Sequence, residues 1–207
     1  MATKKAEAVE LPMVFKLNTV TIPITGTSPL LMHKFSEKAK KMMAENGQAE
    51  VGLKQGGKKK NIADPENDWK ACIHYCSDGK SYGFPAGGFK SGMVNAAFQV
   101  YGRKKTNINA AFNIIADDME TNLVKIIGTP QMREDMVRVG TINKVASPRY
   151  RPVFPVWGAN VTIEYVDGMI TPQELATLIS AAGFSFGLGD WRPEKGGTFG
   201  MYRPQSV

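Results

Sequence analysis

Hydrophobic and polar residues alternate along two long stretches of the chain, and this pattern predicts two principal β-strands. In Met13–Thr25, apolar side chains take every second position from Val20 onward, and in Val153–Tyr165 the alternation holds after Pro155. A period of two places one side of a strand against a core and the other side in water. We expect the second strand to be central in its sheet, and the first to hold Pro23 near an edge or at a bend.

Helices are predicted where apolar residues at helical spacing follow a start signal. Asp64-Pro65 supplies an acidic cap and a proline at the first helical position of a helix that is expected to reach Cys76. Thr171-Pro172-Gln173-Glu174 is a capping box, and the helix that it starts is expected to end at Gly183. The remaining expected elements are helices at 37–45 (capped by Ser36), 89–98 and 107–117, and strands at 122–127 and 136–139, with a loop at 147–152.

The order strand, helices, strand, strand, helix, strand predicts an α+β fold of the ferredoxin-like or RNA-recognition type. We expect an antiparallel sheet with helices on one face. The length of 207 residues fits one domain, which we place at 13–207 behind a disordered lead-in at 1–12. A flexible basic insertion at about 46–63 and a glycine-rich C-terminal loop complete the expected domain.

The net charge of +7, from 26 lysines and arginines against 19 acidic residues, favours a polyanionic partner. Ribosome-associated proteins and proteins of anionic membrane surfaces share such an excess, so the distribution of the cations matters more than their total. No apolar run approaches 18 residues, so no membrane span is expected. Residues 1–12 lack the apolar core of a secretory signal. We therefore expect a cytoplasmic protein (in the host cytoplasm if it is phage-encoded), with Cys72 and Cys76 as thiols.

The C-terminal segment Gly183–Arg203 holds six glycines between Gly183 and Gly200, mixed with aromatic and basic side chains. Glycine lets a ligand or another backbone approach closely, aromatic rings stack on bases, and arginine and lysine contact phosphates. The segment is therefore expected to form a shaped loop that binds a flat, negatively charged partner. The alternative is a structural hairpin that closes the sheet, with Trp191 as its plug.

A second glycine-rich segment, Ser81–Gly88, is expected to turn directly into the helix at 89–98. Such a turn offers free backbone N–H groups and the positive end of the helix dipole to an anion, with Lys90 in the first helical turn. It matches neither a Walker motif nor GxGxxG, so nucleotide hydrolysis is not supported. The alternative is a tight turn where the helix packs on the sheet.

Two further stretches each allow two interpretations. The segment 46–61 contains Lys54 and Lys58–Lys60, and it is either a solvated surface or a mobile loop that clamps a nucleic-acid backbone. Cys72, His74 and Cys76 resemble metal ligands, but on a helix His74 points away from the face that the two cysteines share. Buried thiols are the preferred interpretation, and neither a metal nor a cofactor is expected.

Three segments resemble those of the RAMP superfamily, the repeat-associated proteins that form the backbone of CRISPR effector complexes. Phe84–Ala97 is similar to the segment P-x-S-S-x-K-G-x-x-R-x-A, although Gly87 and Gly88 replace its usual serines and Val94 its basic residue. Gly26–Leu31 is similar to the segment after the first strand of these proteins, and Gly187–Gly200 to their C-terminal glycine-rich loop. The whole chain also resembles uncharacterised proteins of phages and other mobile elements that carry the signature GDWRPEKGG.

The resemblance implies a modified RNA-recognition fold and head-to-tail assembly of copies along a single strand of nucleic acid. With the basic and aromatic residues, it predicts a non-catalytic protein that binds RNA or single-stranded DNA without sequence preference, as a homo-oligomer. The alternatives are a backbone-type ribonuclease that uses Asp64 or Asp68, and a structural assembly subunit. The candidate nucleic-acid-binding residues are His33, Lys34, Lys58, Lys59, Lys60, Lys90, Arg103, Lys104, Lys105, Arg149, Tyr150, Arg151, Trp191, Arg192, Lys195 and Phe199.

Overall fold

An antiparallel sheet of six strands forms the centre of the computed structural model, which describes residues 16–35, 64–139 and 145–205. Its strands lie in the order β3-β5-β8-β1-β9, and β4 pairs with β8 next to β5. The long central pair, β1 and β8, is in register from Leu17 opposite Val166 to Thr25 opposite Gly158. The strands are β1 (Leu17–Gly26), β3 (Tyr82–Pro85), β4 (Phe112–Ile115), β5 (Leu123–Gly128), β8 (Trp157–Val166) and β9 (Tyr202–Pro204).

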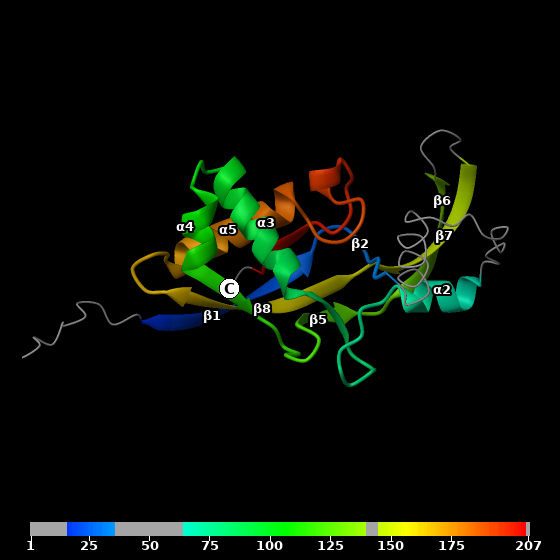
Figure 1. Cartoon of the computed structure of the whole chain (residues 1–207), viewed down its shortest axis with the longest axis horizontal. Coiled ribbons are helices and arrows are strands. Elements are labelled where there is room, and N and C mark those ends of the chain that lie inside the picture. Colours follow the sequence, from blue (N-terminus) through cyan, green and yellow to red (C-terminus); the bar gives the residue numbers. More distant parts are fainter. Residues whose placement is uncertain (1–15, 36–63, 140–144, 206–207) are drawn as a thin grey trace, which may run out of the picture.

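Three helices cover one face of this sheet: α3 (Ala86–Gln99), α4 (Lys105–Ala111) and α5 (Pro172–Ser185) (Figure 1). The hydrophobic core lies between these two layers. Ile22, Ile24, Val161 and Ile163 project into it from β1 and β8, and Phe89 meets them from α3. The predicted α+β fold with helices on one face of an antiparallel sheet is confirmed.

A three-stranded sheet extends from this body at one end of the long axis of the molecule (Figure 1). Its order is β2-β7-β6, with β2 at Leu30–Leu31, β6 at Gln131–Val139 and β7 at Val145–Phe154. The helix α2 (Pro65–Ala71) packs against β7. The β6–β7 hairpin, which we call the arm, therefore extends from the body, and α2 packs against its strand β7.

Several predicted element boundaries are wrong. The helix that starts at Pro65 ends at Ala71 rather than at Cys76, and the expected turn at 81–88 is the strand β3 followed at once by α3. The expected helix at 107–117 is α4 followed by β4, and the expected loop at 147–152 belongs to β7. The predicted helix at 37–45 and basic loop at 46–61 lie outside the described residues.

The expected end of α5 at Gly183 is also wrong, since the helix continues to Ser185. A Cβ atom at Gly183 would collide with the carbonyl oxygen of Tyr202 in β9. The glycine is therefore required because α5 crosses closely over the backbone of β9, and not as a helix terminator. The capping box at the start of α5 is confirmed, with Thr171 Oγ1 accepting from the Glu174 N–H at 3.2 Å.

Candidate nucleic-acid interface

Two adjoining hollows run across the exposed side of α3. The first has a volume of about 370 Å³ and is lined from α3 and α4 by residues that include Gly87, Lys90 and Lys105. The second has a volume of about 140 Å³ and lies between α3 and the C-terminal loop, from Gly187 to Glu194. Ser91 and Asn95 line both hollows. We call the continuous depression the α3 groove; it brings both predicted glycine-rich segments to one surface.

Lysines at the α4 end of the α3 groove contact neutral partners. Lys90 Nζ donates a 2.6 Å hydrogen bond to Asn113 Oδ1, and Lys105 Nζ donates one of 2.9 Å to Asn95 Oδ1. Lys105 also lies 5.0 Å above the Phe98 ring. Within the described ranges, neither of these lysines forms an ion pair. The exposed Lys104 forms no ion pair with the described residues either. An amide partner positions an ammonium group without cancelling its charge, so this end of the groove attracts anions.

The basic residues of the C-terminal loop differ in their availability. Arg192 donates two hydrogen bonds to Glu194 Oε2, at 2.9 and 2.6 Å, and one to the Gly189 carbonyl at 3.0 Å. Its guanidinium group therefore holds the C-terminal loop in shape, and its charge is matched by Glu194. Lys195, in the short 3-10 helix η1 (Pro193–Lys195), is exposed.

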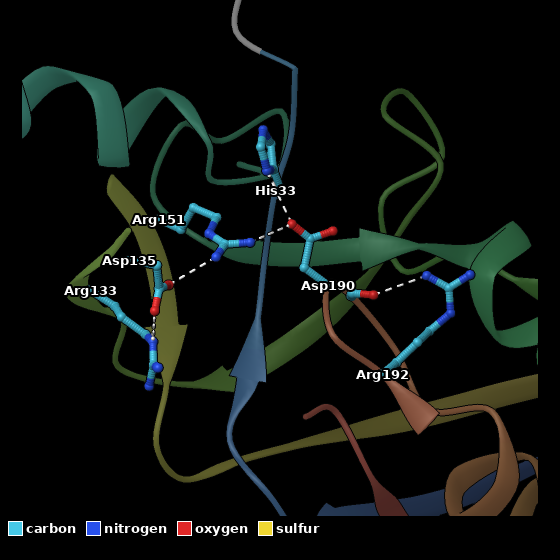
Figure 2. A network of polar contacts seen from close by, with 7 residues as sticks. His33, Arg133, Asp135, Arg151, Asp190 and Arg192 are labelled. Carbon is cyan, nitrogen blue, oxygen red and sulfur yellow. Dashed lines mark hydrogen bonds and ion pairs between the residues drawn. The ribbon is translucent and has the colours of Figure 1, made fainter. Parts of the chain in front are cut away.

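A network of charged side chains connects the arm to the C-terminal loop (Figure 2). Arg151 on β7 donates to Asp190 at 2.8 Å and to Asp135 on β6 at 2.9 Å. Arg133 donates to Asp135 at 2.9 Å, and His33 Nδ1 lies 3.1 Å from Asp190. Burial opposes ionisation of Asp190, but the hydrogen bonds from His33 and Arg151 outweigh it and lower the pKa of the carboxyl group.

The structure places Arg151 differently from the prediction that it contacts phosphates. Its side chain is only 5% exposed and lies between two carboxylates. A buried, paired guanidinium group fixes the joint between arm and body and does not reach a ligand backbone. Arg149 is exposed at the next position on the same side of β7, and Tyr150 points to the opposite side.

An aromatic cluster stands beside this joint. The rings of Trp191 and Phe199 meet edge to face with their centroids 5.9 Å apart. Arg133 lies 5.0 Å above the Phe199 ring, and Arg151 lies 4.6 Å above the Trp191 ring. Trp191 is 40% exposed and has a φ of 51°, which a bulky residue adopts only at a cost. Its carbonyl accepts from the Phe199 N–H at 3.0 Å, so the loop closes on itself around the strained residue.

The other candidate residues are spread around the body. Arg103 pairs with Glu174 at 2.8 Å and so ties the α3–α4 connection to α5. His33 contacts Asp190, and the backbone of the partly buried Lys34 donates to Cys72. Lys58, Lys59 and Lys60 lie outside the described residues. The candidate residues predicted from the sequence did not include Arg133, Asp135 or Asp190; the signals for them were the excess of basic residues between Arg133 and Arg151 and the GDWRP string that contains Asp190.

Asp64 and Asp68, which were considered for catalysis, form hydrogen bonds within the N-terminal turn of α2. The Asp64 carboxylate accepts from the Asn67 N–H at 3.3 Å and from its side-chain amide at 2.7 Å, and Asp68 accepts from the Asp64 N–H at 3.1 Å. Burial is the main cause that raises the pKa of both Cys72 and Cys76. No group of three or more metal-binding side chains occurs within the described part of the chain.

The open face of the sheet offers little to a nucleobase. Along β1 and β8, the outward positions carry Thr19, Thr21, Pro23, Thr25, Asn160, Thr162 and Glu164. RNA-recognition sheets stack bases on aromatic residues at such positions, and none is aromatic here. The aromatic and basic residues lie on the side of the helices and at the arm instead. No helix among the described residues is long and apolar enough to span a membrane.

Comparison with solved structures identifies chains of similar fold. A chain in the cryo-EM structure of the Type III-B Cmr-beta bound to cognate target RNA matches 92% of this chain with a TM-score of 0.52 and 11% identity. This chain covers 60% of the length of that one. The crystal structure of Cmr6 from Pyrococcus furiosus matches 93% of this chain and 100% of its own, with a TM-score of 0.43 and 11% identity.

No protein-family model matches the sequence, and no curated protein matches it. The structural similarity therefore establishes the fold. The predicted resemblance to RAMP-type proteins is confirmed at that level.

Proposed function

We propose that this protein binds single-stranded nucleic acid along the α3 groove, without sequence preference and without catalysis, and that its copies assemble head to tail along the strand. The observation that carries the proposal is the meeting of the two glycine-rich segments in one groove, with Lys90 and Lys105 at one end and hydrogen-bonded only to neutral partners among the described residues. This end of the groove accommodates phosphates because Lys90 and Lys105 form no ion pairs with the described residues, whereas Arg192 at the other end is paired with Glu194.

The fold comparison supports the choice of ligand. A chain of similar fold occurs in a complex that is bound to cognate target RNA. The open face of the sheet lacks aromatic side chains along β1 and β8, and this favours a binding surface on the helical side. Both RNA and single-stranded DNA are proposed ligands, because none of the proposed contacts involves the 2′-hydroxyl group that distinguishes RNA from DNA.

In this proposal the candidate residues fall into two groups. Lys90, Lys104, Lys105, Arg149 and Lys195 contact phosphates, and Trp191 and Phe199 offer the exposed aromatic surface. Arg151, Arg192 and Arg103 hold the scaffold through their carboxylate partners. Contacts to phosphates carry no sequence information, so the protein binds strands of different sequence with similar affinity.

Binding is favoured over nuclease activity because Asp64 and Asp68 are used in the cap of α2. Fluorescence anisotropy with short, labelled RNA and DNA strands of several sequences, measured over a range of salt concentrations, tests the proposal. We expect affinity that falls steeply with salt and changes little with sequence. An affinity that is independent of salt, or confined to one sequence, would contradict it.

A further inference from the structure

The arm carries an exposed apolar surface on the side that faces away from the charged network. Met132 and Met136 on β6 are 46% and 64% exposed. They lie on the same side of the strand as Glu134, while Arg133 and Asp135 project to the other side, toward Arg151. Glu134 is exposed and forms no ion pair with the described residues. Tyr150 on β7, which pairs with Glu134, and the exposed Arg138 on β6 lie on the same side. We call Met132, Glu134 and Met136 the arm face.

A second surface without a partner lies along α5 and β9. An open groove of about 630 Å³, which we call the α5 groove, is lined by apolar residues and Arg203, together with the polar Thr177, Ser180 and Gln205. Phe184 and Tyr101 in its wall are 71% and 48% exposed, which is high for aromatic side chains. Arg203 is exposed, and across the described ranges it has no carboxylate partner.

The two surfaces match each other in chemistry. The arm face presents two flexible apolar side chains around one carboxylate, and the α5 groove presents two aromatic rings beside one guanidinium group. Methionine thioethers pack favourably on aromatic rings. Glu134 between the two methionines suits a cation on the partner surface, and the α5 groove of another copy supplies one in Arg203.

We propose that the arm face of one copy occupies the α5 groove of the next copy, with Glu134 paired to Arg203. This inference rests on the proposed head-to-tail assembly and identifies its contact surfaces. The arm stands at one end of the long axis, and α5 lies over the body sheet (Figure 1), so the contact joins two different surfaces. Repetition of such a contact generates a filament. The α3 groove and the α5 groove share no lining residue, so each copy keeps its nucleic-acid surface open.

Two complementary variants test the contact without nucleic acid. Met136→Asp disables the arm face, and Phe184→Asp disables the α5 groove; both positions are exposed, so both variants are expected to fold. Sedimentation velocity should show concentration-dependent self-association of the wild type and monomers for each variant alone. A mixture of the two should form a one-to-one dimer that does not grow, because one intact arm face meets one intact groove.

A mixture that remains monomeric, a variant that still self-associates alone, or a wild type that is monomeric at every concentration would overturn the proposal. A charge exchange provides a second test. Glu134→Arg and Arg203→Glu should each weaken self-association, and the double variant should restore it toward the wild-type level, since every contact again joins opposite charges. A double variant that is weaker than both single variants would also overturn it.

Binding of a short oligonucleotide separates this inference from the proposed function. All these variants should bind it as the wild type does, because the altered side chains lie outside the α3 groove. If the variants form the one-to-one dimer but the protein binds no oligonucleotide, the interface stands and the proposed function is wrong. If the protein binds the oligonucleotide but the variants form no such dimer, the proposed function stands and this interface is wrong.

Discussion

Arg151 and Asp190 lie 39 residues apart in the chain, and their side chains meet at 2.8 Å where the arm joins the body. The same guanidinium group holds Asp135 on the neighbouring strand at 2.9 Å. One buried cation thus fixes the arm, the C-terminal loop and, through the ring of Trp191, the exposed aromatic cluster. This joint therefore fixes the position of the basic residues of the arm relative to the aromatic residues of the C-terminal loop.

Removal of a carboxylate from this joint is expected to destabilise the protein. Asp135→Ala leaves Arg151 and Arg133 without that partner in a buried position and should cost about 3 kcal/mol or more of unfolding free energy. Urea denaturation measures the change. Lys16→Ala, which breaks the exposed ion pair to Asp167, is the control and should cost less than about 1 kcal/mol. Equal effects would contradict the structural role of the network.

Lys90 and Lys105 are expected to contribute phosphate contacts. The double variant Lys90→Ala, Lys105→Ala should weaken binding to all sequences alike and lower the salt dependence by about one unit of slope for each lost contact. Lys125→Ala is the matched control, because Lys125 is an exposed lysine on the open face of the sheet. A salt titration of anisotropy compares them, and a loss of equal size in the control would contradict the α3 groove.

Trp191 is expected to stack on a base. Trp191→Ala should reduce affinity by about 1–3 kcal/mol, while Trp191→Phe should retain most of it. Quenching of Trp191 emission by the bound strand gives an independent readout, which the variants Trp69→Phe and Trp157→Phe isolate by removing the other two tryptophans. Unchanged affinity together with unchanged emission would assign Trp191 a structural role only.

Gly183 and Gly92 are buried helical glycines that should respond in opposite ways to alanine. A Cβ atom at Gly183 collides with the Tyr202 carbonyl, so Gly183→Ala should destabilise by about 1–3 kcal/mol. At Gly92 the nearest atom, Cβ of Ala182, is 3.6 Å away, and Gly92→Ala should stabilise α3 by up to about 1 kcal/mol. Thermal unfolding distinguishes the two, and a stabilising Gly183→Ala would contradict the close crossing of α5 over β9.

Asp118 should make stability depend on acidic pH. The Thr121 hydroxyl and the Ser77 N–H hydrogen-bond to its carboxylate and lower its pKa from 3.8 to about 2. The folded state therefore favours the ionised form, and its contribution is present above pH 3.8 and is lost as the pH falls through about 2. The stability difference between wild type and Asp118→Asn should be constant at neutral pH and shrink across this window. A difference that grows toward low pH would contradict the assignment.

The period-two strands and the capped helices were predictable because their signals are local. Alternation located β1 and β8, and the capping box located the start of α5. The strand β7 was missed because Pro148 and Pro152 argue against a strand. The pairing of β7 shows why prolines are tolerated there. The strand β2 pairs only with Val153 and Phe154, so at Pro148 the edge of β7 that faces away from β6 has no partner strand.

The candidate site was predictable in its residue types and not in its pairing. Glycine-rich segments and lysines are visible in sequence, and the structure brings Gly87, Lys90 and Gly189 to the α3 groove. No local pattern shows that Arg151 is neutralised by Asp190, because the two are 39 residues apart, whereas the partner of Arg192, Glu194, is only two residues away. The number of arginines in the sequence is therefore larger than the number whose charge is available to a ligand.

We expect that many copies coat a single strand of nucleic acid and leave it intact. Size-exclusion chromatography with light scattering, with and without a long single-stranded RNA or DNA and at two salt concentrations, tests it most directly. Large nucleoprotein particles should form at low salt, dissociate at high salt and release a strand of unchanged length. A protein that forms no complex at low salt, or one that shortens the strand, would contradict it.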